Sequence, residues 1–216
     1  MEIFLDSIDF DEITKYRSYG VIDGVTTNPT LIASATVEFH EVVSKICSLK
    51  DIDVSIEVPS NDYESMVKEG EKLLKMASNI VIKLPVTWDG IRACKYFTDI
   101  GQKTNMTLCF SANQAILAAK AGATYISPFI GRLDDIGSDG MQLIEDIRVI
   151  YDNYGFKTKI LAASIRTLEH VSEAAICGAD VVTIPGKLLS QLVNHDLTDQ
   201  GLAKFNADWA KSGMKI

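Results

Sequence analysis

Eight short runs of apolar, largely β-branched residues recur along the whole chain and constrain its fold more than any other feature. They span Ile3–Asp6, Gly24–Thr27, Val54–Val58, Ile80–Leu84, Met106–Phe110, Tyr125–Phe129, Ile160–Ala163 and Val181–Ile184. Within each run the apolar residues follow one another instead of alternating with polar ones. This pattern is typical of strands that are buried on both faces. The sequence therefore predicts a sheet that is covered on both sides.

Stretches with helical spacing of apolar residues separate these runs, for example Tyr63–Met76, Asn113–Ala121 and Gly140–Tyr151. Strands that alternate with helices predict parallel βαβ units. Eight units in 216 residues give roughly 27 residues each, which fits a compact (β/α)8 barrel. We expect an α/β protein whose residues 1–216 form a single (β/α)8 TIM barrel. An open doubly wound sheet is the alternative, because counting strands does not prove closure.

The last segment, Thr198–Lys211, predicts an additional C-terminal helix at about residues 198–211. Leu202, Phe205 and Trp209 fall on one face of this helix. Such a stripe most often packs on its own barrel, so that is the expected position. The helix could instead cap the mouth of the barrel or clasp a neighbouring subunit.

Composition and charge argue against several classes of partner and location. The net charge of −8 repels nucleic acid and anionic lipid at long range. No apolar run approaches the roughly 20 residues that a membrane span requires, and the first residues do not resemble a signal peptide. The four cysteines are far apart and form no CxxC pair, which is typical of reduced thiols. We therefore expect a cytoplasmic protein that binds neither nucleic acid nor membrane.

Charged residues inside apolar strands are the strongest functional signal. Asp6 ends the first run, Glu57 lies in the third and Lys83 in the fourth. Burying a charge without a partner is costly, and parallel barrels build their active sites where the strands end. A structural ion pair is the alternative. A partly desolvated lysine amine, however, can attack a ketone and form an iminium ion, while carboxylates move protons.

Further polar residues follow the other strands. Arg132 and Arg166, together with Ser164, offer donors for a phosphate, which guanidinium groups bind in a bidentate manner. Each arginine alone would more often be a solvated surface group. The three histidines lack the spacing of metal ligands, so we expect no metal site.

With these residues in place, the chain resembles the transaldolase family, in particular its short, single-barrel branch. Five phrases carry the resemblance, in the family's order and over nearly the full length: Phe4–Asp6 (FLD), Gly24–Ile32 (GVTTNPTLI), Val81–Thr87 (VIKLPVT) with Gly90, Ser127–Asp134 (SPFIGRLD) and Leu161–Arg166 (LAASIR). The GVTTNP phrase and the lysine phrase are both specific.

The resemblance implies a role for each matching position. Lys83 matches the Schiff-base lysine and Asp6 the acid/base group, while Glu57 and Thr107 match the groups that hold a catalytic water. The positions that match the dihydroxyacetone pocket are Thr26, Asn28, Asn105 and Ser127, and those that match the phosphate site are Arg132, Ser164 and Arg166. The substrates would be sugar phosphates of the non-oxidative pentose phosphate pathway, sedoheptulose 7-phosphate or fructose 6-phosphate among them. No metal or organic cofactor would be needed.

Two other functions stay open on the sequence. The neighbouring branch, fructose-6-phosphate aldolase, releases free dihydroxyacetone; it has Gln where this chain has Glu57, Tyr where it has Phe129, and lacks Asn105. The combination in this chain is similar to true transaldolases. A catalytically silent barrel that binds sugar phosphates is the third possibility, since fold alone does not decide function. Members of the short branch are ring-like homo-oligomers, decamers among them, so we also expect a homo-oligomer.

Overall fold

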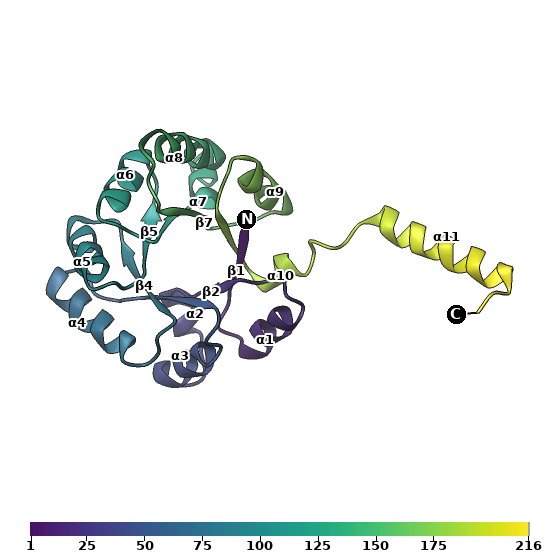
Figure 1. Cartoon of the computed structure of the whole chain (residues 1–216), viewed down its shortest axis with the longest axis horizontal. Coiled ribbons are helices and arrows are strands. Elements are labelled where there is room, and N and C mark those ends of the chain that lie inside the picture. Colours follow the sequence, from purple (N-terminus) through teal and green to yellow (C-terminus); the bar gives the residue numbers. More distant parts are fainter. Residues whose placement is uncertain (216) are drawn as a thin grey trace.

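Eight parallel strands close into a barrel in the computed structural model, which describes residues 1–215. The strands follow one another in chain order around the ring, and β1 pairs with both β2 and β8 (Figure 1). The strands are β1 (Glu2–Asp6), β2 (Gly24–Thr26), β3 (Asp53–Glu57), β4 (Ile80–Pro85), β5 (Thr104–Cys109), β6 (Tyr125–Pro128), β7 (Lys159–Ala162) and β8 (Val181–Ile184). The predicted TIM barrel is therefore confirmed, and an open sheet is excluded.

Helices surround this barrel and connect successive strands (Figure 1). They are α1 (Phe10–Ser18), α2 (Pro29–Ala33), α3 (Phe39–Cys47), α4 (Tyr63–Leu74), α5 (Trp88–Asp99), α6 (Ala112–Lys120), α7 (Ile130–Asp134), α8 (Gly140–Tyr154) and α9 (Leu168–Ile176). Two more helices, α10 (Gly186–Leu189) and α11 (Asp196–Ser212), follow the last strand. Within residues 1–215 no helix is both long and apolar enough to cross a membrane. The four cysteines are free thiols.

Several helices begin at a side chain that lies just after a strand and caps the helix. Asn28 Oδ1 accepts a hydrogen bond from the backbone N–H of Leu31 at 2.9 Å, and Thr87 Oγ1 accepts one from Gly90 at 3.0 Å. Such caps satisfy backbone donors that the first helical turn leaves free. They fix the loops at the carboxyl ends of the strands, where the predicted site residues lie.

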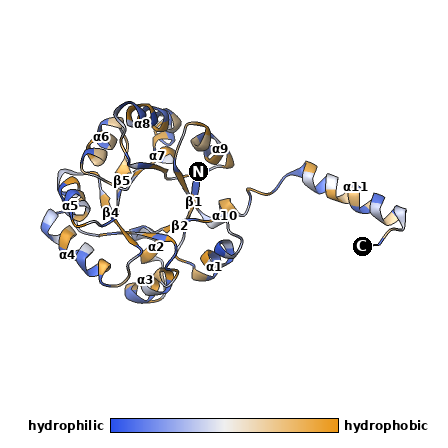
Figure 2. Cartoon of the chain, viewed as in Figure 1, coloured by the Kyte–Doolittle hydropathy of each residue, from blue (hydrophilic) through white to orange (hydrophobic). Residues whose placement is uncertain are grey.

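Apolar residues form two separate layers. The larger layer lies between the strands and the helices and includes Leu5, Phe97 and Ile144. The helices of the ring accordingly carry both hydrophobic and hydrophilic residues (Figure 2). The smaller layer fills the barrel interior and consists of Phe4, Val81, Tyr125, Leu161, Ala163 and Val181, with Phe129 packed against it.

The interior layer reaches from the amino-terminal half of the barrel, where Tyr125 and Val181 begin their strands, to the floor of a cavity that Leu161 and Ala163 line. The rings of Phe4 and Tyr125 meet edge to face, with centroids 5.6 Å apart. A glycine at position 24 makes room for them, because a Cβ atom there would lie 2.6 Å from the Phe4 ring. Polar side chains occupy the other half of the interior, towards the carboxyl ends of the strands, and this division places the candidate site.

Helix α11 corrects one prediction. The helix forms over Asp196–Ser212, but it does not pack on its own barrel as expected; it extends away from it (Figure 1). Leu202, Phe205 and Trp209 remain 55, 70 and 50% exposed. The segment after α10 leads away from the ring, so the apolar face of α11 stays largely exposed.

Candidate active site

A cavity of about 480 Å³ opens at the carboxyl ends of the strands, a volume suited to a small organic ligand. It brings together all the predicted site residues except Thr107: Asp6, Thr26, Asn28, Glu57, Lys83, Asn105, Ser127, Phe129, Arg132, Ser164 and Arg166. These residues come from strands or loops spread over 160 positions of sequence, as expected for the mouth of a parallel barrel.

Lys83 lies inside the barrel because β4 alternates, with Ile82 and Leu84 packed outward and Val81 and Lys83 inward. Its side chain is 6% exposed, and Nζ lies 3.1 Å from Glu57 Oε2. Nζ also donates a hydrogen bond to the carbonyl oxygen of Thr27 at 2.9 Å. A buried ammonium group is tolerated only with such partners. The amine is thus held at a fixed point on the cavity wall, beside a carboxylate that can accept its proton.

Asp6 faces the same cavity from β1. Its Oδ1 accepts a hydrogen bond from the hydroxyl of Thr26 at 3.0 Å, and the amide nitrogen of Asn28 lies 3.5 Å away. Burial raises the pKa of the Asp6 carboxyl, and this effect is the largest. The charge of Lys83 and the hydrogen bonds from Thr26 and Asn28 lower the pKa in part, but the net shift is upward. Among the described residues none donates to Oδ2, so this oxygen is available to a substrate hydroxyl.

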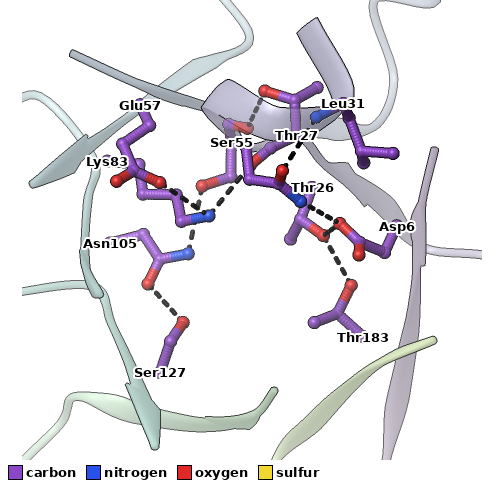
Figure 3. A network of polar contacts seen from close by, with 11 residues as sticks. Asp6, Thr26, Thr27, Leu31, Ser55, Glu57, Lys83, Asn105, Ser127 and Thr183 are labelled. Carbon is purple, nitrogen blue, oxygen red and sulfur yellow. Dashed lines mark hydrogen bonds and ion pairs between the residues drawn. The ribbon is translucent and has the colours of Figure 1, made fainter. Parts of the chain in front are cut away.

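Asn105 belongs to a chain of hydrogen bonds along the cavity wall, shown in Figure 3. Its amide nitrogen donates to Ser55 Oγ at 3.0 Å, and its amide oxygen accepts from Ser127 Oγ at 2.7 Å. All three residues are buried. The amide is thereby fixed in orientation without any bound ligand.

The residues predicted to bind phosphate lie together at the rim of the cavity. Arg166 forms two hydrogen bonds to Asp135, at 3.0 and 2.7 Å, and the guanidinium carbon of Arg132 lies 5.0 Å from the centre of the Phe129 ring. Ser164 has a φ of 60°, a left-handed conformation that non-glycine residues rarely adopt. A Cβ atom on Gly131 would lie 2.2 Å from the Ser164 carbonyl oxygen and 2.7 Å from Arg166 Cγ. Glycine at position 131 therefore allows the segment after β6 to lie directly against the loop after β7.

Thr107 lies behind the surface of the cavity. It is completely buried, and its hydroxyl has no hydrogen-bond partner within the described chain. The next residue, Leu108, lines the cavity instead and has a φ of 59°. The register between β5 and β6 shifts between Met106 and Cys109, which accounts for the changed direction of the side chains there.

Three polar residues of the site were not among the predicted site residues: Thr27, Ser55 and Thr183. The Thr27 carbonyl holds Lys83, Ser55 holds Asn105, and the hydroxyl of Thr183 lies 2.6 Å from that of Thr26. Ser55 and Thr183 each interrupt an apolar strand. That is the signal that identified Lys83, and it applies equally to uncharged polar residues.

Comparison with known proteins agrees with this geometry. The family described as Transaldolase/Fructose-6-phosphate aldolase matches residues 3–216. Proteins called "Probable transaldolase" from Dinoroseobacter shibae, Sinorhizobium medicae and Brucella ovis are 57, 58 and 58% identical to this chain. Each of these alignments covers 216 residues and the whole of both chains.

Proposed function

Because the chain belongs to the transaldolase/fructose-6-phosphate aldolase family, we propose that it is a transaldolase that works through a Schiff base on Lys83. It transfers a dihydroxyacetone unit from a ketose phosphate, sedoheptulose 7-phosphate or fructose 6-phosphate, to an aldose phosphate. This reaction belongs to the non-oxidative pentose phosphate pathway. The observation that carries the proposal is the buried Lys83 amine, 3.1 Å from Glu57, in a cavity that Asp6 also lines.

The first step is the formation of the imine. Glu57 accepts a proton from the Lys83 ammonium group, with which it is in direct contact. The free amine then adds to the ketone carbon of the substrate, and the carbonyl oxygen takes the proton that leaves the added nitrogen. Glu57 returns its proton to the departing hydroxyl, so that loss of water gives an iminium ion. Glu57 supplies a polar group for the water of this step. The family resemblance gives Thr107 the same role; its hydroxyl has no partner among the described residues but lies behind the cavity surface.

The second step breaks the carbon–carbon bond. Oδ2 of Asp6 takes the proton of the hydroxyl on the β carbon, and the electron pair of that O–H bond forms the second bond of an aldehyde. The electron pair of the breaking carbon–carbon bond moves towards the iminium nitrogen, and an enamine remains on Lys83. The aldose phosphate departs, a second aldose phosphate accepts the enamine carbon, and Asp6 returns its proton to the new alkoxide.

The remaining cavity residues bind and orient the substrate. Thr26, Asn28, Asn105 and Ser127 present hydroxyl and amide groups to the dihydroxyacetone part. Arg132, Ser164 and Arg166 bind the phosphate at the rim, where guanidinium groups form charge-assisted hydrogen bonds. The distribution of these groups along one cavity supports a substrate with hydroxyls at one end and a phosphate at the other.

Release of free dihydroxyacetone is the alternative outcome, because the matching family includes fructose-6-phosphate aldolase. Glu57, Asn105 and Phe129 favour transfer, since they match the pattern of transaldolases. The test is a steady-state assay of fructose 6-phosphate with and without an aldose phosphate acceptor, on the wild-type protein and the Lys83→Met variant. Turnover that depends on both the acceptor and Lys83 supports transfer. Acceptor-independent dihydroxyacetone indicates the aldolase, and unchanged activity of the variant refutes the lysine mechanism.

We also propose that the protein is a cytoplasmic homo-oligomer, ring-like as in its family, in which α11 contacts a neighbouring subunit. The exposed apolar face of α11, which includes Phe205, supports this arrangement, and the unpaired thiols are those of a reducing compartment. Sedimentation of the full chain and of a chain ending at residue 195 tests it. A monomeric full-length chain would contradict the proposal.

A further inference from the structure

Thr183, at the carboxyl end of β8, forms the far end of a short chain of hydroxyl groups that leads to Asp6. It is 6% exposed, and its Oγ1 lies 2.6 Å from Thr26 Oγ1. Thr26 in turn lies 3.0 Å from Asp6 Oδ1. Strand β1 lies between β2 and β8, so the three side chains meet across three neighbouring strands (Figure 3).

The carboxylate of Asp6 fixes the direction of the hydrogen bonds between these side chains. An ionised carboxylate can only accept hydrogen bonds, so the single hydroxyl proton of Thr26 points to Asp6. Thr26 then has no proton left for Thr183, and the hydroxyl of Thr183 must donate to Thr26. Hydrogen bonds in such a chain polarise one another, so the donation from Thr183 strengthens that from Thr26.

The direction reverses when Asp6 carries the proton on Oδ1. The carboxylic acid can then donate to Thr26, and Thr26 can donate to Thr183. In this reversed arrangement the proton of the Thr183 hydroxyl has no acceptor among the described residues, because its neighbour Thr26 already donates to it. The arrangement that serves the ionised carboxylate gives both threonine protons an acceptor, so the two hydroxyls favour that form of Asp6.

We propose that Thr183 is a positioning residue that acts through Thr26 to stabilise the ionised form of Asp6, the form that accepts the substrate proton. The proposal rests on the role assigned to Asp6 in the transaldolase reaction. It extends that role to Thr183 on β8, which lines the same cavity but acts on Asp6 through Thr26.

Other charged groups near Asp6 stay the same when Thr183 is changed. Lys83 on β4 and Glu57 on β3 form their own ion pair, and Arg132 and Arg166 line the same cavity from α7 and the loop after β7. Glu12 on α1 accepts from Ser7, directly after β1. A difference between two variants at position 183 therefore isolates the hydroxyl group.

The test compares Thr183→Val, which keeps the shape but loses the hydroxyl, with Thr183→Ser, which keeps the hydroxyl. We expect the acid limb of the kcat/KM profile of Thr183→Val to move to higher pH, with a loss of about threefold on the acid side and convergence at high pH. Thr183→Ser restores the wild-type limb. An unmoved limb in Thr183→Val, or an equal shift in both variants, would overturn the proposal even if the melting temperature falls.

A second measurement does not depend on turnover. Infrared titration of the carboxylic-acid stretch, with Asp6→Asn as the subtraction reference, follows the protonation of Asp6 itself. We expect Asp6 to keep its proton to higher pH in Thr183→Val than in the wild type or in Thr183→Ser. Equal titrations refute the role of Thr183. If the wild type has no transaldolase activity, the proposed function fails, yet this titration still decides whether Thr183 acts on Asp6.

Discussion

Replacing Asp6 with asparagine is expected to stabilise the fold while it removes activity. The pKa of Asp6 in the folded protein is raised above its ordinary value of 3.8 because the carboxyl is buried. Below that ordinary value both the folded and the unfolded states are protonated. As the pH rises from 3.8 through the raised pKa, the unfolded state gives up its proton before the folded state does, and stability is lost until both states are ionised. Asparagine stays neutral and still offers an oxygen to Thr26.

The size of the effect follows from this partial burial. Thr26 and Asn28 hydrogen-bond to the carboxylate and Lys83 attracts it, so only part of the desolvation penalty remains. We expect the Asn variant to be more stable at pH 8 by about 1 kcal/mol. For a chain of this length that corresponds to a melting temperature higher by roughly 2–4 °C. The gain shrinks as the pH falls, whereas kcat drops by about 10²–10⁴-fold because the general base is lost.

Thermal unfolding between pH 3 and 8 checks this, because the gain changes only between the ordinary pKa of 3.8 and the raised pKa of Asp6; Asp53→Asn is the matched control. Asp53 lies at the other end of the barrel, where it accepts from Lys103 at 2.8 Å and from the Tyr125 hydroxyl at 2.8 Å. Both variants remove one negative charge. Asp53→Asn, however, removes a carboxylate that is paired with Lys103, so we expect it to lower the stability of the fold. The reasoning fails if Asp6→Asn is no more stable than the wild type at pH 8, or if its gain does not change with pH.

Other substitutions test the rest of the site. Glu57→Gln should lower kcat by about 10²-fold, because proton removal from the Lys83 amine becomes slower. It should also raise the ratio of free dihydroxyacetone to transferred product; an unchanged ratio in a coupled assay speaks against the role of Glu57 in favouring transfer. Arg166→Ala should raise KM for fructose 6-phosphate about 10- to 100-fold and leave KM for fructose unchanged, while Arg17→Ala, remote from the cavity, serves as control. Gly131→Ala should lower the stability by about 1–3 kcal/mol and raise the same KM, because its Cβ meets the Ser164 carbonyl at 2.2 Å; calorimetry that finds an unchanged melting temperature contradicts this.

Much of the fold could be predicted because parallel strands buried on both faces leave a strong local pattern. Each predicted strand lies within two residues of the observed one. Barrel closure could not be derived from the pattern, since it depends on the pairing of β1 with β8. The short helices α2, α7 and α10 are too brief to show a period, and the apolar stripe of α11 does not by itself show what the helix packs on.

The site residues that could be predicted from the sequence are charged residues in strands that the apolar pattern predicts to be buried. Lys83, Glu57 and Asp6 are conspicuous because each interrupts an apolar strand, and the topology brings them to one mouth. A contact through the backbone, such as the Thr27 carbonyl that holds Lys83, leaves no such signal in the sequence. Thr183 does interrupt an apolar strand, but the sequence does not show that its hydroxyl meets that of Thr26. The left-handed turn at Leu108, which leaves Thr107 behind the cavity surface, depends on a register shift that no local pattern marks.

The central claim is that Lys83 forms a covalent imine with a ketose phosphate and retains a three-carbon unit. The most direct measurement is the intact mass of the protein after incubation with fructose 6-phosphate and borohydride, for the wild type and Lys83→Met. We expect a reduced adduct of three-carbon size on the wild type and none on the variant. A wild-type protein that binds fructose 6-phosphate but gains no mass would contradict the mechanism, and the cavity would then only bind a sugar phosphate.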